Sequence, residues 1–281
     1  MVNIILIVVI VLFAWILFAQ WGMRFRISDS DARERFSANG VELTTGKVNV
    51  NDFYIHYAKT GNDTFPTIIF IHGSPGSWLS YEKYMKDKDL LAKYRMISID
   101  RPGFGYSEFG DAKNLEEQSK LISPLLEIFN NHKPVYIAGH SLGGPVAAQI
   151  AADNPNSFAG LILLSAAIDP SEERSEKWRP LFFRSPWKQL VPGAFYPSNK
   201  ELWYLKNDLL KLQTDLANIH CRVWIVHGLK DVYVPVGNAE FSKKMLVNAK
   251  SVEMTLIPKA NHFIHTLHYD IVKGVLMNLQ E

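Results

Sequence analysis

The sequence has little cysteine and little net charge, and each of these features excludes a class of protein. Cys221 is the single cysteine in 281 residues, so neither an intrachain disulfide framework nor a multi-cysteine metal site can form. The formal net charge is +2, and the sequence contains no long run of charges of one sign. Neither feature indicates a nucleic-acid-binding surface. With 47% hydrophobic and 21% charged residues, the composition is that of a globular protein, which excludes a disordered or collagen-like chain.

One long apolar run stands near the beginning of the sequence. Residues 4–19 are all apolar, and with their neighbours they approach the roughly 20 residues that span the hydrocarbon of a membrane. A cleaved signal peptide would carry a basic residue before the run and a small-x-small cleavage site, but no Lys or Arg precedes it and Leu17 stands where a small residue should precede Ala19. We therefore predict that residues 1–26 form an uncleaved membrane anchor with a basic flank, with a cleaved signal as the alternative.

Basic residues follow the apolar run, and they predict its orientation. Arg24, Arg26, Arg33 and Arg35 all lie on its C-terminal side, so the positive-inside rule predicts a single-pass membrane protein with the rest of the chain in the cytoplasm. The polar residues 27–40 suit a linker between membrane and fold. Removal of residues 1 to about 26 is therefore expected to leave the remaining domain folded and active.

The rest of the chain, residues 41–281, alternates short apolar runs with helical stretches. Residues that favour β-strands on both sides of Asn51 and Asp52 predict an opening hairpin. Apolar runs that alternate with helices are typical of a mostly parallel sheet that is covered by helices. The predicted strands are residues 67–71, 94–99, 135–138, 161–164, 223–226 and 252–257, and the predicted helices are residues 115–130, 142–152, 238–247 and 268–279.

One gap breaks this alternation. Close to sixty residues separate the fourth and fifth apolar runs, which is too long for a structureless loop, so we predict an inserted subdomain over about residues 169–219. The insert is rich in aromatic residues between Trp178 and Tyr204, and residues 203–216 have helical spacing. Its aromatic side chains are expected to pack the insert onto the main domain, to form an apolar ceiling over a ligand cleft, or both.

The strongest chemical signal is a G-x-S-x-G turn around Ser141. It follows the apolar run 135–138 and precedes an Ala-rich helical stretch. Gly139 and Gly143 leave room where the strand reverses sharply into the helix, and the turn lifts the Ser141 hydroxyl clear of the backbone. Ser141 is the candidate nucleophile.

A serine hydroxyl is a weak nucleophile near neutral pH, so it needs a histidine base and a carboxylate that orients the base. Asp231 follows the fifth apolar run, and His262 follows the sixth and lies closer to its strand end than His265 or His268. The order Ser, Asp, His, each at the carboxyl end of a strand, is the arrangement that such a triad requires. We predict Asp231 as the acid and keep Asp169, which follows the fourth run, as its rival.

A glycine-rich turn, His72–Gly76, follows the first apolar run. Preorganised backbone N–H groups stabilise the negative charge that acyl transfer places on oxygen. The N–H groups of Ser74 and Leu142 are the candidate oxyanion hole, since Pro75 has no N–H to donate. His72 is expected to brace this loop through hydrogen bonds. No metal or cofactor site is expected.

Together with the loop Asp100–Ser107, the segment Gly228–Asp231 and the Asn261-His262-Phe263 triplet, these motifs resemble the α/β-hydrolase superfamily from about Val41 onward. The match is to its serine-nucleophile, capped, esterase- and lipase-like branch. The resemblance implies a mostly parallel eight-stranded sheet with helices on both faces, and it makes the insert a small helical cap. Asn261 departs from the glycine that often precedes the family's histidine, which bears on the geometry of that loop.

The resemblance and the apolar segment imply a membrane-tethered serine hydrolase. It would cleave carboxylic ester or thioester bonds of a small-molecule or lipid-like substrate with an apolar part. The dehalogenase and epoxide-hydrolase branches need a carboxylate nucleophile, which the serine at position 141 argues against. A proline-iminopeptidase-like amide hydrolase is one alternative, because the cap contains Glu172, Glu173, Glu176 and Glu201, although such glutamates are expected to be solvated. A non-catalytic binding module is the other.

Overall fold

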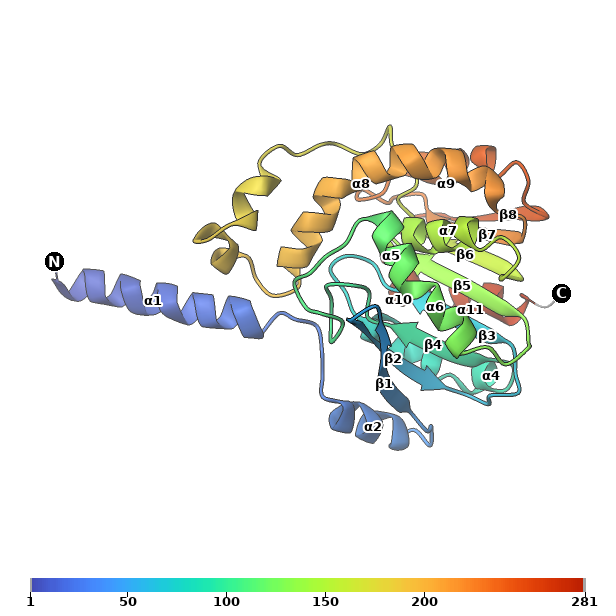
Figure 1. Ribbon diagram of the computed structural model, residues 1–281, viewed down its shortest axis with the longest axis horizontal. Coiled ribbons are helices and arrows are strands. Elements are labelled where there is room, and N and C mark those ends of the chain that lie inside the picture. Colours follow the sequence, from blue (N-terminus) through green and yellow to red (C-terminus); the bar gives the residue numbers. More distant parts are fainter. Residues whose placement is uncertain (1, 280–281) are drawn as a thin grey trace.

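The computed structural model describes residues 2–279, so Met1 of the predicted anchor and the last two residues of the predicted domain lie outside the described residues. An eight-stranded sheet forms the centre of the protein, in the order β1-β2-β4-β3-β5-β6-β7-β8 (Figure 1). The strands are Thr44–Val50 (β1), Phe53–Thr60 (β2), Thr67–Ile71 (β3), Arg95–Ile99 (β4), Val135–His140 (β5), Gly160–Leu164 (β6), Arg222–Gly228 (β7) and Ser251–Ile257 (β8).

The sheet is mostly parallel, as the sequence predicts. β1 pairs antiparallel with β2 as the expected hairpin, and β2 pairs antiparallel with β4. All other neighbouring strands pair in parallel. Because β3 lies directly beside β5, the turn after β3 and the turn after β5 meet at one edge of the sheet.

Helices cover both faces of the sheet, and each face has its own apolar core. Helices α5 to α9 pack on one face, and α2 to α4 with α10 and α11 pack on the other. The helices are Val2–Trp21 (α1), Asp29–Ser37 (α2), Glu82–Met85 (α3), Lys88–Leu91 (α4), Leu115–Ile122 (α5), Pro124–Ile128 (α6), Gly143–Asp153 (α7), Phe195–Asp215 (α8), Gly237–Met245 (α9), Ile264–Leu267 (α10) and Tyr269–Met277 (α11), and short 3-10 turns occur at Trp78–Tyr81 (η1), Arg179–Phe183 (η2), Trp187–Leu190 (η3) and Leu216–Asn218 (η4).

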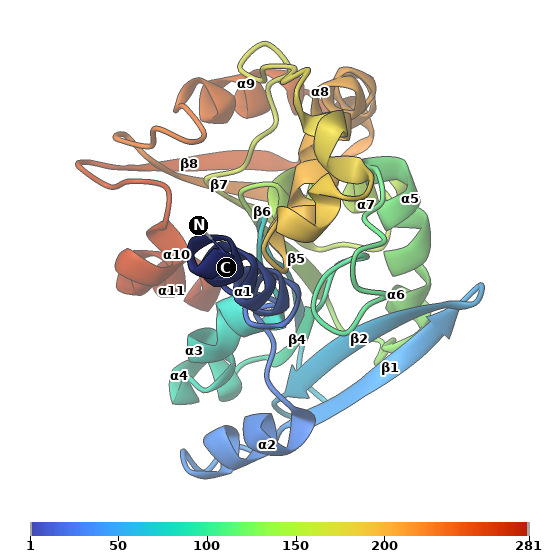
Figure 2. The same cartoon turned by 90° about the vertical axis from the view of Figure 1, so that its left-hand side faces the viewer.

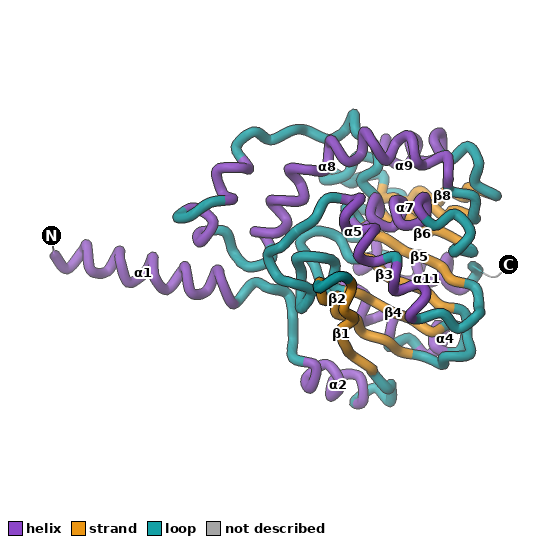
Figure 3. The backbone as a smooth tube through the Cα atoms, viewed as in Figure 1, coloured by secondary structure: helices purple, strands orange, loops and turns teal. Residues whose placement is uncertain are grey.

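One of the predicted helices is divided into two in the structure, and a short helix that the sequence does not predict precedes another. The stretch 115–130 is interrupted at Ser123, because Pro124 has no N–H to continue the hydrogen-bond ladder and begins α6 instead. The last predicted helix is preceded by the short α10. The insert between β6 and β7 holds η2, η3, α8 and η4, joined by long loops (Figure 3). Its main helix begins at Phe195, eight residues before the predicted start.

The polar segment 27–40, which the sequence predicts as a linker, is partly helical and packs on the domain. It contains α2, whose N-terminus is capped by the Ser28 hydroxyl, which accepts a hydrogen bond from the Asp31 N–H at 3.1 Å. Ala32 and Phe36 are fully buried, and the Phe36 ring lies 6.0 Å from that of Trp78. Two apolar side chains on an otherwise polar helix are enough to dock it on the domain, and composition alone hides such a pair.

Helix α1 extends away from the domain (Figures 1 and 2). Its stretch Asn3–Trp21 is long and apolar enough to cross a membrane, and its side chains are almost all exposed. A helix that is apolar on every side and almost wholly exposed is stabilised by an apolar environment other than the protein core.

Candidate active site

Ser141 occupies a sharp turn between β5 and α7. Its φ is +55°, in the left-handed region that an L-residue with a side chain rarely adopts. Backbone bonds hold this turn, because the Ser141 N–H donates to the Leu164 carbonyl at 3.0 Å and the Gly144 N–H donates to the Ser141 carbonyl at 2.9 Å. A Cβ on Gly139 would overlap the Gly143 carbonyl, so only glycine fits there. Ser141 is partly exposed, whereas the residues on both sides of it are buried.

Asp231 and His262 form a short hydrogen bond at the carboxyl ends of β7 and β8. The distance from His262 Nδ1 to Asp231 Oδ2 is 2.7 Å. The other carboxylate oxygen accepts hydrogen bonds from the N–H groups of Tyr233 at 3.0 Å and Val234 at 2.9 Å. Burial acts to raise the pKa of Asp231, but the hydrogen bonds from His262 and Val234 outweigh it and leave that pKa below its ordinary value. Asp231 is therefore an ionised acceptor for the imidazole.

This bond fixes the orientation of the imidazole. Because the carboxylate accepts the proton on Nδ1, the neutral His262 ring presents its Nε2 lone pair as a base. The rival acid is engaged elsewhere, since Asp169 Oδ1 accepts hydrogen bonds from the backbone N–H and the hydroxyl of Ser171 at 2.8 and 2.7 Å. The structure thus brings Asp231, and not Asp169, into contact with His262.

Three histidine rings lie close together between the nucleophile turn and the base. The His140 ring lies 4.8 Å from that of His262 and 3.9 Å from that of His265, and His140 Nε2 donates to the His262 carbonyl at 3.0 Å. Burial and the neighbouring histidines lower the pKa of His140 well below its ordinary value, and burial lowers that of His265 to about 4. His140 and His265 are therefore neutral near pH 7. Sequence reasoning gave His140 no role, although it stands directly before Ser141 in the motif.

The glycine-rich turn after β3 lies against the nucleophile. A Cβ on Gly73 would be 3.1 Å from the Cβ of Ser141, so a side chain at position 73 would crowd the nucleophile turn. His72 braces this turn as expected: its Nδ1 donates to the Gly73 carbonyl at 2.6 Å and its Nε2 accepts from the Arg101 N–H at 3.1 Å. Burial and the Arg101 charge lower the pKa of His72 well below its ordinary value, so it stays neutral.

The two candidate oxyanion donors lie on these adjoining turns. Neither the Ser74 N–H nor the Leu142 N–H has a hydrogen-bond acceptor among residues 2–279. Leu142 directly precedes α7, where the positive end of the helix dipole favours a developing anion. The Ser74 hydroxyl donates to that of Ser198 on the cap helix at 2.8 Å. The arrangement leaves both N–H groups able to bind a substrate oxygen.

Comparisons with known proteins agree with the fold. Residues 66–189 match the family described as the alpha/beta hydrolase fold. The chain belongs to the α/β-hydrolase superfamily. "Serine hydrolase BPHL" of Homo sapiens is 26% identical over 250 residues, which are 82% of this chain and 84% of that protein. The solved structure of a bacterial membrane phospholipase A superposes with a TM-score of 0.62 and 17% identity over 98% of each chain, a likeness of fold.

A third relative matches only part of its own length. "Epoxide hydrolase 1" of Caenorhabditis elegans is 30% identical over 154 residues, which are 53% of this chain but 37% of that protein. The similarity therefore covers a shared portion of the α/β-hydrolase fold and not the whole relative.

The insert predicted to be the cap is joined to the glycine-rich turn by a buried ion pair. Arg101 and Glu201 are both buried, with Nη1 to Oε2 at 2.6 Å and Nη2 to Oε1 at 2.9 Å. Arg101 also donates to the His72 carbonyl at 2.8 Å and the Gly73 carbonyl at 3.1 Å. The expectation that the cap glutamates are solvated is thus wrong for Glu201. The sequence indicates the ion pair between Arg101 and Glu201 only weakly, through the presence of a charged residue in the Asp100–Ser107 loop.

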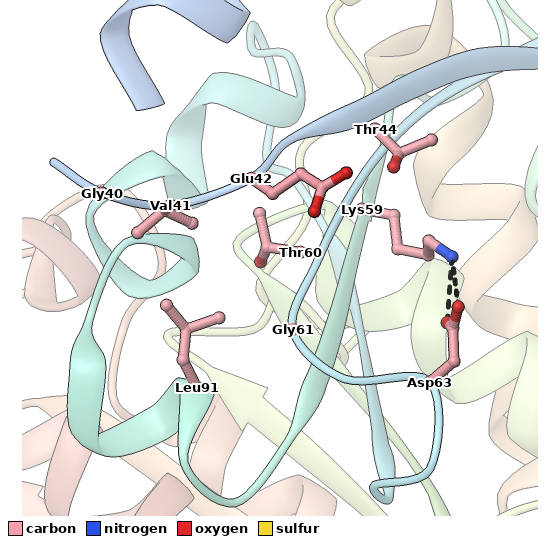
Figure 4. Close-up of a pocket in the computed structure, with 9 residues that line it drawn as sticks. All are labelled: Gly40, Val41, Glu42, Thr44, Lys59, Thr60, Gly61, Asp63 and Leu91. Carbon is pink, nitrogen blue, oxygen red and sulfur yellow. Dashed lines mark hydrogen bonds and ion pairs between the residues drawn. The ribbon is translucent and has the colours of Figure 1, made fainter. Parts of the chain in front are cut away.

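One surface hollow lies apart from these groups. It has a volume of about 360 Å³ and includes the Lys59–Asp63 ion pair of 2.9 Å (Figure 4). None of the candidate catalytic residues lines it, so we give it no part in the chemistry. Within the described part of the chain, no group of three or more His, Cys, Asp or Glu side chains is placed to hold a metal ion.

Proposed function

We propose that this α/β-hydrolase is a membrane-tethered serine hydrolase. It cleaves carboxylic ester or thioester bonds of a small-molecule or lipid-like substrate with an apolar part, and Ser141, His262 and Asp231 are its triad. The observation that carries the proposal is the 2.7 Å bond between Asp231 and His262, beside a serine held at a φ of +55°. This geometry supports a base and a nucleophile that act together.

The reaction follows from these positions. His262 Nε2 takes the Ser141 hydroxyl proton as Oγ attacks the acyl carbon, and then gives that proton to the departing alkoxide or thiolate. The resulting acyl-enzyme is hydrolysed by water in the same two steps. Ionised Asp231 stabilises the imidazolium in between. The N–H groups of Ser74 and Leu142 stabilise the oxyanion by about 3 kcal/mol for each donor.

An ester fits the cap better than a peptide amine does. A proline-iminopeptidase-like enzyme would use a free carboxylate to bind the ammonium group of its substrate. Arg101 already neutralises Glu201, the buried glutamate nearest the candidate oxyanion loop, so Glu201 has no charge to spare. The serine at position 141 likewise argues against epoxide hydrolysis through a carboxylate nucleophile.

We further propose that residues 1–26 are the anchor, that residues 41–281 are the catalytic domain and that its cap is the insert 169–219. The arginines that follow the apolar run favour a domain on the cytoplasmic side. An anchored chain resists carbonate extraction from membranes, and a protease added to the cytoplasmic side digests its domain. A mature chain that begins near residue 20 in a soluble fraction would show that the segment is a cleaved signal.

The central experiment is labelling with a fluorophosphonate, followed by turnover of p-nitrophenyl esters of rising chain length. Ser141→Ala should abolish labelling and lower turnover by as much as roughly a million-fold. Ser165→Ala is the matched control, since Ser165 is also at a strand end, has a φ of +43° and is buried, with no hydrogen-bond partner for its hydroxyl among the described residues. Absent labelling of the native chain would favour a non-catalytic binding module.

A further inference from the structure

Apolar side chains of the cap point outward. Trp178 is 52% exposed, Leu181 55% and Trp187 46%, and all three lie in or next to η2 and η3. The sequence predicts that the aromatic side chains of the insert pack it onto the domain, cover a ligand cleft, or do both. Trp178 and Trp187 are too exposed to be explained by packing alone. Exposed apolar groups that gather on one segment mark a surface that meets a partner.

The end of α1 is docked beside this segment. The Gln20 side-chain amide donates to the Gln189 carbonyl at 2.9 Å, and the Ala194 N–H donates to the Met23 carbonyl at 2.7 Å. The Gly193 N–H donates to the carbonyl of Ala19, which is fully buried. These bonds set the direction in which α1 leaves the domain. Figures 1 and 2 both show the η2–η3 part of the cap alongside α1.

The length of α1 sets the depth of this contact. The 19 residues of Asn3–Trp21 rise about 28 Å, which is close to the thickness of the hydrocarbon layer. If the helix spans the layer, its last turn lies at the membrane–water boundary. Trp21, 80% exposed at the end of α1, suits that level, since tryptophan favours the interface. Because η3 contacts the same turn, it lies at the same depth.

The charge of the segment points to the same environment. Residues 177–190 contain Lys177, Arg179, Arg184 and Lys188 but no Asp or Glu. Arg179 pairs with Glu176, whereas Arg184 and Lys188 are exposed. Basic side chains close to a membrane are attracted to anionic lipid headgroups.

We propose that the face formed by residues 177–190, which we call the cap face, is a membrane-interface surface. It sits among the headgroups of an anionic bilayer with Trp178, Leu181 and Trp187 inserted at the acyl boundary. The inference rests on the proposed function in one respect, that α1 spans this bilayer. Helix α8, which carries Glu201, follows the cap face directly in the chain, so the site is held at the membrane surface where an ester-bearing lipid resides.

The test uses the full chain with Leu181→Cys, labelled with bimane and reconstituted into vesicles of phosphatidylcholine and phosphatidylglycerol. Brominated lipids should quench the label at position 181. Val247→Cys is the matched control, because Val247 is also an exposed apolar residue, at 70%. It lies in the chain between α9 and β8, two elements that Figure 1 shows on the side of the domain away from α1. A label at 247 should not be quenched. Cys221 is buried, so the native chain serves as the blank.

Carbonate extraction of the same vesicles separates the two ideas. A chain that stays in the pellet while its label at 181 is unquenched overturns the cap-face proposal and leaves the anchor intact. A chain released by carbonate overturns the anchor, and with it the placement of the cap face.

A second variant tests the consequence for activity. Leu181→Asn with Trp187→Gln should lower the rate on a vesicle-embedded ester roughly tenfold, because it removes two apolar contacts with the bilayer. Its rate on a short soluble ester should be unchanged, which also shows that it folds. An equal loss on both substrates would mean that the two side chains support the cap and do not bind membrane.

Discussion

Arg101 and Glu201 lie 100 positions apart in the chain, yet they form a buried ion pair with a closest distance of 2.6 Å. Arg101 holds the carbonyls of the turn that carries Ser74, and Glu201 belongs to the cap helix α8. A buried charge without its partner is costly in free energy. The ion pair therefore favours the position of the cap in which Arg101 and Glu201 meet. Cap placement and the candidate oxyanion hole are therefore coupled.

Glu201→Gln should expose this coupling, because it leaves the Arg101 charge buried without an anion. We expect a loss of about 3 kcal/mol in the free energy of unfolding and a lower kcat. Thermal melting and ester kinetics measure the two effects. Glu172→Gln, at an exposed cap glutamate, is the control and should change neither. A Glu201 variant that melts and turns over like the native protein would show that the pair does not support the loop.

Asp231→Asn should lower kcat by about ten-thousand-fold, because an amide can hold the His262 ring in the wrong tautomer. Asp169→Asn should cost less than about tenfold, since within residues 2–279 that carboxylate bonds to Ser171 and not to the imidazole. Steady-state kinetics on one p-nitrophenyl ester compare the pair directly. The opposite ranking would move the acid to the loop after β6.

Stability should fall as the pH drops from about 6.5 toward 4, partly because of His265. Its pKa in the folded protein is lowered to about 4 by burial, so between these values the unfolded chain binds more protons than the folded one. The contribution of neutral His265 to the free energy of unfolding is present in full above the pKa of this histidine in the unfolded chain. It is lost as the pH falls, because proton binding then favours the unfolded chain. His265→Leu should flatten this part of the profile of melting temperature against pH.

The control for that profile is His220→Leu, because His220 is exposed. It should keep the native slope. Equal slopes for the native chain and the His265 variant would mean that the ring is hydrated or charged in the folded state.

Two truncations should behave differently, which refines the expectation that residues 1–26 are dispensable to the domain. A chain from residue 19 keeps the Ala19 and Met23 carbonyls that bond to the cap, and it should turn over short soluble esters at the native rate. A chain from residue 27 also loses the Arg26 bond to the Gly105 carbonyl and the Arg26–Tyr106 contact of 4.6 Å. We expect it to be about 1 to 3 kcal/mol less stable.

Thermal melting of the two purified chains measures this difference. Identical melting temperatures would show that the contacts between residues 19–26 and the domain contribute nothing to its stability.

The sequence by itself determined the features that depend on neighbouring residues. Apolar runs and their spacing located the strands, and the glycines on both sides of Ser141 indicated the turn, because these patterns reflect local backbone geometry. Asp231 and His262 could be chosen from their positions after apolar runs, since parallel strands place their carboxyl ends at one edge of the sheet.

Only the tertiary structure decided which distant groups meet. It paired Arg101 with Glu201, brought the ring of His140 close to those of His262 and His265, and docked α2 on the domain. It also turned Trp178 and Trp187 outward and placed η3, which contains Trp187, beside α1. Each outcome depends on how segments far apart in the chain pack together. A charge or an aromatic ring has the same letter in the sequence whether it faces water, lipid or a buried partner, and its environment arises only when the chain folds.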